Sequence, residues 1–212
     1  VDIDNITGLP MAHPKSASFR TADMVGLDTF LHVAQNCYTA LADDEERDVF
    51  QAPDVLRQMA EKKLLGDKTK GGFYKKDKRE GVLMLDLATL EYRARTGNDE
   101  IAKVTKSIAK VDDPKERVRK LVADPGPTGK FAWKVLARSL AYTARRLGEI
   151  SDSVVAIDDA MRWGYNWELG PFQVWDALGF VATCERMEKD GVSVPDAIKK
   201  MRASGATSFY ND

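Results

Sequence analysis

The chain has 212 residues, enough for one large or two small domains that bury an ordinary hydrophobic core. Lys and Arg number 32 against 33 Asp and Glu, so a net charge of −1 provides no broad positive field for nucleic acid. No apolar run approaches the roughly 20 residues that span a bilayer. Only Cys37 and Cys184 are present, which argues against a disulfide framework. These numbers predict a cytoplasmic protein that neither enters a membrane nor binds nucleic acid.

The first residues carry no initiator Met and no basic, apolar leader. We expect the chain to have been cut from a longer protein, although processing produces the same kind of start.

Helical periodicity is the main signal in the first third of the chain. One helix is predicted from Leu27, with Asp28 placed to cap its first turn. A second is predicted to begin at Pro53 and Asp54 and to end before Gly66.

A small β-hairpin is predicted next. Residues 71–74 and 82–85 are its strands, and the charged stretch 75–80 is its solvated tip. A binding patch for a partner at this basic tip is the less favoured interpretation.

The remaining chain is predicted to be helical. A helix begins at Asn98, and Asp113 with Pro114 starts another as a cap and a first-turn proline. The Pro- and Gly-rich run 124–129 cannot continue a helix and forms the best internal boundary. Further helices are predicted along 132–147, from 154 to near Gly164, and along 171–178, 181–190 and 195–204.

Several residues recur in the same order in the two halves of the chain. The pairs are Asp2 with Asp158, Gly8 with Gly164, Phe19 with Phe172, Asp23 with Asp176, Gly26 with Gly179, and Phe73-Tyr74 with Phe209-Tyr210. Coincidence and a generic helix-loop-helix unit are the alternatives to duplication. Two copies of a helical unit can cover each other's apolar faces, as in a symmetric dimer.

The predicted fold class is therefore all-α, mainly α with one small β-hairpin, in which two tandem helical repeats pack as a pseudo-dimer. The expected divisions are a first repeat with the hairpin at 1–97, a helical connector at 98–128 and a second repeat at 129–212.

Longer stretches carry a resemblance to a known family. The segments AIDDAMRWG at 156–164, WELGPF at 167–172 and WDALG at 175–179 closely resemble the C-terminal domain of 3-hydroxyacyl-CoA dehydrogenases. The segments RTADMVGLDT at 20–29 and GDKTKGGFY at 66–74 resemble the same domain again. Two tandem copies are what this resemblance implies for the large, often multifunctional β-oxidation enzymes, some of which also carry an enoyl-CoA hydratase domain.

The resemblance also implies where the chemistry takes place. In that family a preceding domain binds NAD and supplies a His–Glu pair, whose His takes the hydroxyl proton while hydride leaves for the nicotinamide. No G-x-G-x-x-G follows a strand here, and Gly71-Gly72 precedes a hairpin instead of opening a helix. We therefore expect no catalytic, cofactor-binding or metal-binding residue in this chain, and no activity from it alone.

The resemblance implies three partners: the N-terminal NAD-binding domain of the same polypeptide, an acyl-CoA substrate, and in some members a fused hydratase domain. A non-catalytic α-helical module for oligomerisation or interaction is the alternative function.

A substrate-binding segment is also implied. The family's Gly-Pro-Phe segment lies beside the acyl-CoA pocket, but the first copy reads Ala-Ser-Phe at 17–19, which weakens a direct transfer of contacts. Lys15 and Arg20 could meet CoA phosphates as cations, and solvated surface charges are the favoured alternative. The residues assigned to substrate binding are Pro14, Lys15, Ser16, Phe19 and Arg20.

Other polar candidates receive structural interpretations. His13 is expected to be a solvated loop residue and His32 a packed or half-exposed helical one, and two isolated histidines make no metal site. Asp23 and Asp176 are expected to cap or tether the helices that begin beside them. The three tryptophans Trp163, Trp167 and Trp175 are interpreted as core residues in preference to a stacking surface for adenine.

Overall fold

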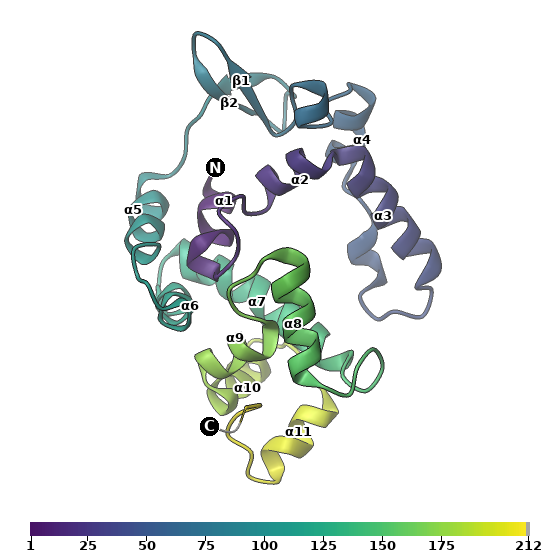
Figure 1. Ribbon diagram of the computed structural model, residues 1–212, viewed down its shortest axis with the longest axis vertical. Helices are drawn as coiled ribbons and strands as arrows, with labels where there is room; N and C mark the ends of the chain where they lie inside the picture. The colour runs from purple at the N-terminus through teal and green to yellow at the C-terminus, as the bar shows by residue number, and fades with distance from the viewer. Residues whose placement is uncertain (211–212) are drawn as a thin grey trace. The chain divides into compact units, whose positions relative to one another are not determined.

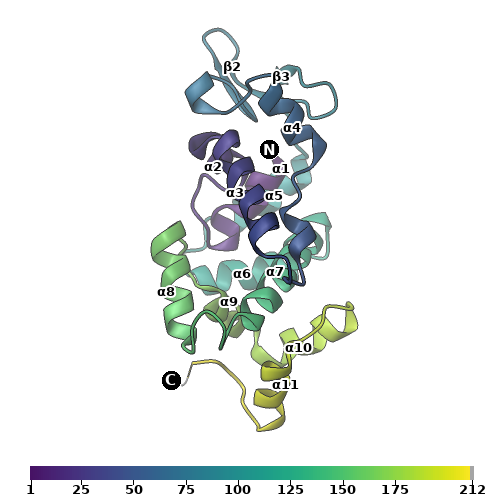
Figure 2. The same cartoon turned by 90° about the vertical axis from the view of Figure 1, so that its right-hand side faces the viewer.

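The computed structural model describes residues 1–210 and divides into two compact units. Unit 1 contains residues 1–4 and 16–98, and unit 2 contains residues 5–15 together with the chain from residue 99 onward. Both are mainly helical, and the one sheet within residues 1–210 is in unit 1 (Figures 1 and 2). The mainly helical class predicted from the sequence is confirmed. No helix of the described residues is both long and apolar enough to cross a membrane.

Unit 1 consists of short helices and a three-stranded sheet. Helix α1 (Asp2–Thr7) has residues in both units. The other elements of unit 1 are α2 (Phe19–Val25), α3 (Leu27–Ala40), η2 (Arg47–Phe50), α4 (Asp54–Glu61), η3 (Asp67–Thr69), β1 (Tyr74–Asp77), β2 (Gly81–Leu85) and β3 (Tyr92–Ala94). Its buried core is formed by Leu27, Met59, Phe73 and Leu85.

Helices α3 and α4 show which helix signals were correct. Helix α3 begins at the predicted Leu27, but Gly26 holds the N-cap position and Asp28 pairs with Lys68 instead of capping. Helix α4 ends at Glu61, before the predicted stop, because the chain turns through a left-handed residue at Lys63. Gly66 instead forms a tight turn, in which its backbone exchanges hydrogen bonds with Gly71.

The sheet differs from the predicted hairpin in register and in strand number. Its strands pair antiparallel in the order β1-β2-β3, with Tyr74 opposite Met84 and Asp77 opposite Gly81. The charged residues 75–77 are therefore strand and not tip, and residues 71–73 precede the strand. Strand β3 was not predicted, since three residues with charged neighbours show no apolar alternation.

Unit 2 is a helical bundle. Its elements are η1 (Leu9–Met11), α5 (Asp99–Ile108), α6 (Pro114–Ala123), α7 (Pro127–Arg145), α8 (Val154–Tyr165), α9 (Pro171–Leu178), α10 (Phe180–Lys189) and α11 (Asp196–Ala203). Helices α6, α7 and α9 contact one another (Figure 2). The apolar side chains buried in this unit include Val118, Leu140 and Trp175.

The local signals at the start of α6 are confirmed. Asp113 accepts a hydrogen bond from the Lys115 N–H at 2.9 Å, and Pro114 occupies the first turn. The predicted break at 124–129 is shorter than expected, because α7 already begins at Pro127. Gly129 lies so close to the Asp124 carbonyl that a Cβ there would approach it to 2.1 Å.

The tryptophans do not form the predicted core group. Trp175 is fully buried, but Trp163 is 79% exposed near the end of α8. Trp167 is partly buried and stacks on His13. Helical spacing alone does not distinguish the buried face of α8 from its exposed face, because apolar residues occur on both.

Candidate functional site

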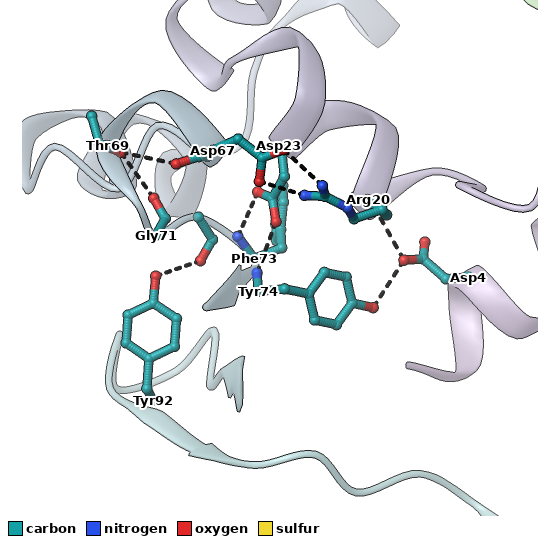
Figure 3. Close-up of polar contacts among 11 residues, drawn as sticks. Asp4, Arg20, Asp23, Asp67, Thr69, Gly71, Phe73, Tyr74 and Tyr92 are labelled. Carbon is teal, nitrogen blue, oxygen red and sulfur yellow. Dashed lines mark hydrogen bonds and ion pairs between the residues drawn. The ribbon is translucent and has the colours of Figure 1, made fainter. Parts of the chain in front are cut away.

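A buried carboxylate organises unit 1. Asp23, on α2, is only 3% exposed, and it accepts hydrogen bonds from the backbone N–H groups of Phe73 (2.8 Å) and Tyr74 (2.9 Å). Figure 3 shows this carboxylate facing the start of strand β1. It therefore joins α2 to a segment some fifty residues later in the chain.

A second carboxylate, Asp4, completes the arrangement. It accepts hydrogen bonds from the backbone N–H groups of Phe19 (2.7 Å) and Arg20 (3.2 Å), which belong to the open first turn of α2. The Tyr74 hydroxyl donates a third hydrogen bond to it at 2.9 Å (Figure 3). Asp4 thus caps α2 from outside the helix, since the first N–H groups of a helix have no partner within it.

In unit 2, a carboxylate of α8 holds the start of α9 in the same way. Asp158 is 1% exposed and accepts hydrogen bonds from the backbone N–H groups of Phe172 (2.8 Å) and Gln173 (2.9 Å). The Tyr210 hydroxyl donates to it at 2.7 Å. These three donors correspond one by one to those on Asp4.

The second carboxylate of unit 2 is Asp176. It accepts hydrogen bonds from the backbone N–H groups of Phe209 (2.9 Å) and Tyr210 (3.1 Å), as Asp23 does from a Phe-Tyr pair. By these contacts the counterpart of Asp158 is Asp4, whereas the sequence comparison paired it with Asp2. Asp2 instead accepts a hydrogen bond from the Asn98 N–H.

These carboxylates are suited to holding structure and not to acid-base chemistry. Burial raises the pKa of Asp23, Asp158 and Asp176 above the usual Asp range, and the hydrogen bonds that they accept oppose this shift. Burial and the neighbouring carboxylates likewise raise the pKa of Tyr74 and Tyr210, so both hydroxyls stay protonated donors. Asp23 and Asp176 were expected to cap or tether the helices that begin beside them, and the structure corrects this: each holds a distant Phe-Tyr segment.

Two glycines are required beside these carboxylates. A Cβ on Gly72 would lie 2.0 Å from Asp23 Oδ1, and a Cβ on Gly170 would lie 2.3 Å from the Asp158 Cβ. The Gly71-Gly72 segment therefore approaches a carboxylate and leads into a strand, not into a helix N-terminus. A nucleotide pyrophosphate is negatively charged and binds at the N-terminus of a helix, away from carboxylates. This segment therefore does not fit NAD.

The residues predicted to bind substrate are distributed over the two units. Pro14 and Lys15 belong to unit 2, and Lys15 is exposed. Ser16, in unit 1, accepts a hydrogen bond from the Thr21 hydroxyl at 2.9 Å. The ring of Phe19 packs against that of Phe73, with centroids 4.5 Å apart.

Arg20 is engaged within unit 1. Its guanidinium donates two hydrogen bonds to the Asp67 carboxylate, at 2.6 and 2.7 Å, in a bidentate pair (Figure 3). This pair lowers the pKa of Asp67 through the hydrogen bond and the charge of Arg20. Both side chains are partly exposed, so the pair contributes little to stability while orienting the guanidinium.

His13 was expected to be solvated, and the structure corrects this. Its ring stacks on Trp167 with centroids 4.0 Å apart, and its Nδ1 lies 3.1 Å from the Thr7 carbonyl oxygen. A neutral ring with its proton on Nδ1 donates to that carbonyl. Burial lowers the pKa of His13 to about 4. The loop forms a packed turn around η1, which composition alone does not show. His32 is exposed on α3.

No group of three or more His, Cys, Asp or Glu side chains that could hold a metal ion occurs within residues 1–210.

The role of the tyrosines can be tested at Tyr210. We expect Tyr210→Phe to destabilise unit 2 by about 1–2 kcal/mol, because one acceptor position on buried Asp158 loses its donor. All four tryptophans lie in unit 2, so urea unfolding followed by tryptophan fluorescence measures this unit. Tyr165→Phe, at a residue 64% exposed, is the matched control. Equal stability of the two variants would contradict a tethering role.

Comparison with known proteins agrees with this architecture. A crystal structure of 3-hydroxybutyryl-CoA dehydrogenase from Escherichia coli K12 covers 97% of this chain and is itself covered to 56%, with a TM-score of 0.54. Because only 16% of residues are identical, this likeness shows the fold alone.

Sequence relatives give more specific matches. A "Probable 3-hydroxyacyl-CoA dehydrogenase" of Bacillus subtilis is 42% identical over 209 residues, which are 99% of this chain and 26% of that protein. A protein of Rickettsia felis, named as a trifunctional enzyme of the fatty acid oxidation complex, is 26% identical over 82% of this chain and 23% of its own length. The chain thus spans about a quarter of these relatives. Residues 1–76 match the family model described as the 3-hydroxyacyl-CoA dehydrogenase, C-terminal domain.

Proposed function

We propose that the chain is the substrate-side and assembly region of an NAD-dependent 3-hydroxyacyl-CoA dehydrogenase, which oxidises 3-hydroxyacyl-CoA to 3-oxoacyl-CoA in fatty acid β-oxidation. The observation that carries this proposal is the 42% identity to the Bacillus subtilis relative along nearly the whole chain. In this proposal an N-terminal domain of the same polypeptide binds NAD and contains the catalytic residues. The enzyme acts in a reducing cytoplasm. The isolated chain is then inactive.

We also propose that the chain holds two copies of one helical unit. The carboxylate contacts support it: Asp4 and Asp158 each accept two N–H groups of a following helix and one tyrosine hydroxyl. Asp23 and Asp176 each accept the N–H groups of a Phe-Tyr pair. Five matched acceptor contacts on residues in the same chain order are hard to obtain by coincidence.

Exposed apolar side chains support a neighbouring domain. In unit 1, Met24 and Val25 of α2 and Phe30 and Val33 of α3 are each 47–59% exposed. Large apolar side chains exposed on two consecutive helices are a common feature of a surface that a partner covers. A non-catalytic interaction module would use such a surface too, so it is the function that the experiment below must distinguish.

The proposed function is tested by a chimera. In the Bacillus subtilis relative, the quarter that matches this chain is replaced by residues 1–212, and NADH formation from 3-hydroxybutyryl-CoA is followed. We expect the chimera to retain activity within about tenfold of the parent, and the isolated chain to show none. A folded chimera without activity would favour the interaction module, and turnover by the isolated chain would contradict the division of labour.

The substrate-binding proposal for the segment from Pro14 to Arg20 is tested in the same chimera. If Arg20 contacts a CoA phosphate, Arg20→Gln raises KM by about tenfold, whereas Asp67→Asn frees the guanidinium and leaves KM unchanged or lower. Equal effects of the two variants would assign the pair a structural role only.

A further inference from the structure

A pocket in unit 2 is not used by the proposed function. Its volume is about 470 Å³, within the range of small-molecule sites. It lies between the end of α6, the C-terminal end of α9 and the first turn of α10, and α7 contributes Trp133. The charged side chains in its wall are Arg119, Arg186 and Asp176.

The Arg119 guanidinium is anchored by one of its N–H groups, and its other N–H groups remain available as donors. Its Nε donates a hydrogen bond to the carbonyl of Ala177, another residue of the pocket wall, at 2.5 Å. Among the described residues, its two terminal nitrogens have no hydrogen-bond or ion-pair partner. A guanidinium anchored through Nε presents its remaining N–H groups as a planar fork, the geometry that matches a phosphate group.

Arg186 is positioned in the same wall by an aromatic ring. Its guanidinium lies over Trp133, 4.1 Å from the ring centroid, and donates to the carbonyl of Val122 at 3.4 Å. Its Nε is 3.9 Å from Asp190, whose carboxylate also accepts the Trp133 indole N–H at 2.7 Å. This stacking already restricts the side-chain rotamers of Arg186. Binding an anion therefore costs it less conformational entropy than a free arginine would lose.

One acidic residue, Asp176, accompanies the two cations in the pocket wall. The Asp176 carboxylate is already engaged by the N–H groups of Phe209 and Tyr210. Gly179 caps α10 without a side chain, so the first N–H groups of this ten-residue helix face no capping carboxylate or hydroxyl. The wall thus carries two guanidinium groups against one carboxylate, beside a helix start that has no capping side chain.

We propose that this pocket binds a phosphate group, either a terminal phosphomonoester or free phosphate, through the guanidinium groups of Arg119 and Arg186. Two forks and a helix start suit a doubly charged, three-oxygen group better than a carboxylate. Two sources supply such a group: the 3′-phosphate of CoA and free inorganic phosphate. The inference stands whether or not the dehydrogenase proposal holds.

The experiment is a calorimetric titration of the 212-residue chain at low salt with CoA, dephospho-CoA and inorganic phosphate. We expect binding that Arg119→Gln and Arg186→Gln each weaken by about tenfold, the loss of one charge-assisted contact. Lys120→Gln is the matched control, since this exposed cation is next to Arg119 on α6 and pairs with Glu116. Circular dichroism verifies that every variant keeps the helical fold.

The titrants distinguish the two sources of phosphate. Tighter binding of CoA than of dephospho-CoA, with the difference lost in both arginine variants, supports the proposal with the 3′-phosphate as ligand. Arginine-dependent binding of inorganic phosphate, with equal affinity for the two coenzymes, supports it with free phosphate as ligand. Affinities that the arginine variants leave unchanged, or absence of binding by all three titrants, overturn it without affecting the chimera test.

Discussion

Replacing Asp158 with alanine is expected to destabilise unit 2 by about 3–5 kcal/mol. The carboxylate is 1% exposed and accepts hydrogen bonds from the Phe172 and Gln173 N–H groups and the Tyr210 hydroxyl. Alanine leaves these three donors without a partner in a region largely shielded from water, and each orphaned donor costs about 1–3 kcal/mol. The start of α9 and the C-terminal Phe-Tyr segment should loosen together.

Urea unfolding followed by tryptophan fluorescence is the measurement, because all four tryptophans lie in unit 2. Asp159→Ala is the matched control: the adjacent carboxylate forms a partly exposed, local ion pair with Arg162, so its loss should cost less than about 1 kcal/mol. A difference of under about 1 kcal/mol between the two variants would show that Asp158 does not anchor α9.

Acid is expected to destabilise unit 2 through His13. The folded protein lowers the pKa of this ring from 6.5 to about 4, and burial is the main cause. Because the unfolded chain binds the proton more readily, stability is complete above pH 6.5 and is lost as the pH falls from 6.5 toward 4. At 1.36 kcal/mol per pKa unit, the loss by pH 4 is at most about 3 kcal/mol.

Tryptophan-detected urea unfolding at pH 7 and pH 4.5 measures this loss. His13→Phe keeps an aromatic ring against Trp167 but cannot be protonated, so it should remove the His13 part of the pH dependence. The carboxylates that titrate in the same range remain in both proteins, so the difference between them isolates the ring. His32→Phe, at the exposed histidine of α3, should keep the full pH dependence. An identical acid loss in wild type and His13→Phe would refute the assignment.

The accuracy of the sequence predictions differs between a helix start, a short strand and a hairpin tip. The start of α6 was predicted correctly because Asp113 and Pro114 act within their own turn. Strand β3 was missed because three residues carry too little pattern. The tip of the hairpin was misplaced because the adjacent lysines of β1, Lys75 and Lys76, are exposed on the strand just as they would be in a loop.

The same contrast holds for the candidate site. The repeated order of the Asp, Phe and Tyr residues is recognisable in the sequence. The hydrogen bonds that connect these residues are not. Asp2 was paired with Asp158 where Asp4 makes the equivalent hydrogen bonds. A signal was present, since Ile-Asp occurs at 3–4 and again at 157–158. The pocket wall that contains Arg119 and Arg186 left no sequence motif, because its residues come from four helices.

By itself, the sequence determined the mainly helical class, most helix positions and the resemblance to the dehydrogenase family, because these depend on residues near one another in the chain. Only the tertiary structure decided that His13 is packed, that Trp163 is exposed, and that Asp23 and Asp158 each hold a distant segment. Those outcomes depend on which groups lose contact with water when segments dozens of residues apart come together, and burial of that kind has no local signature.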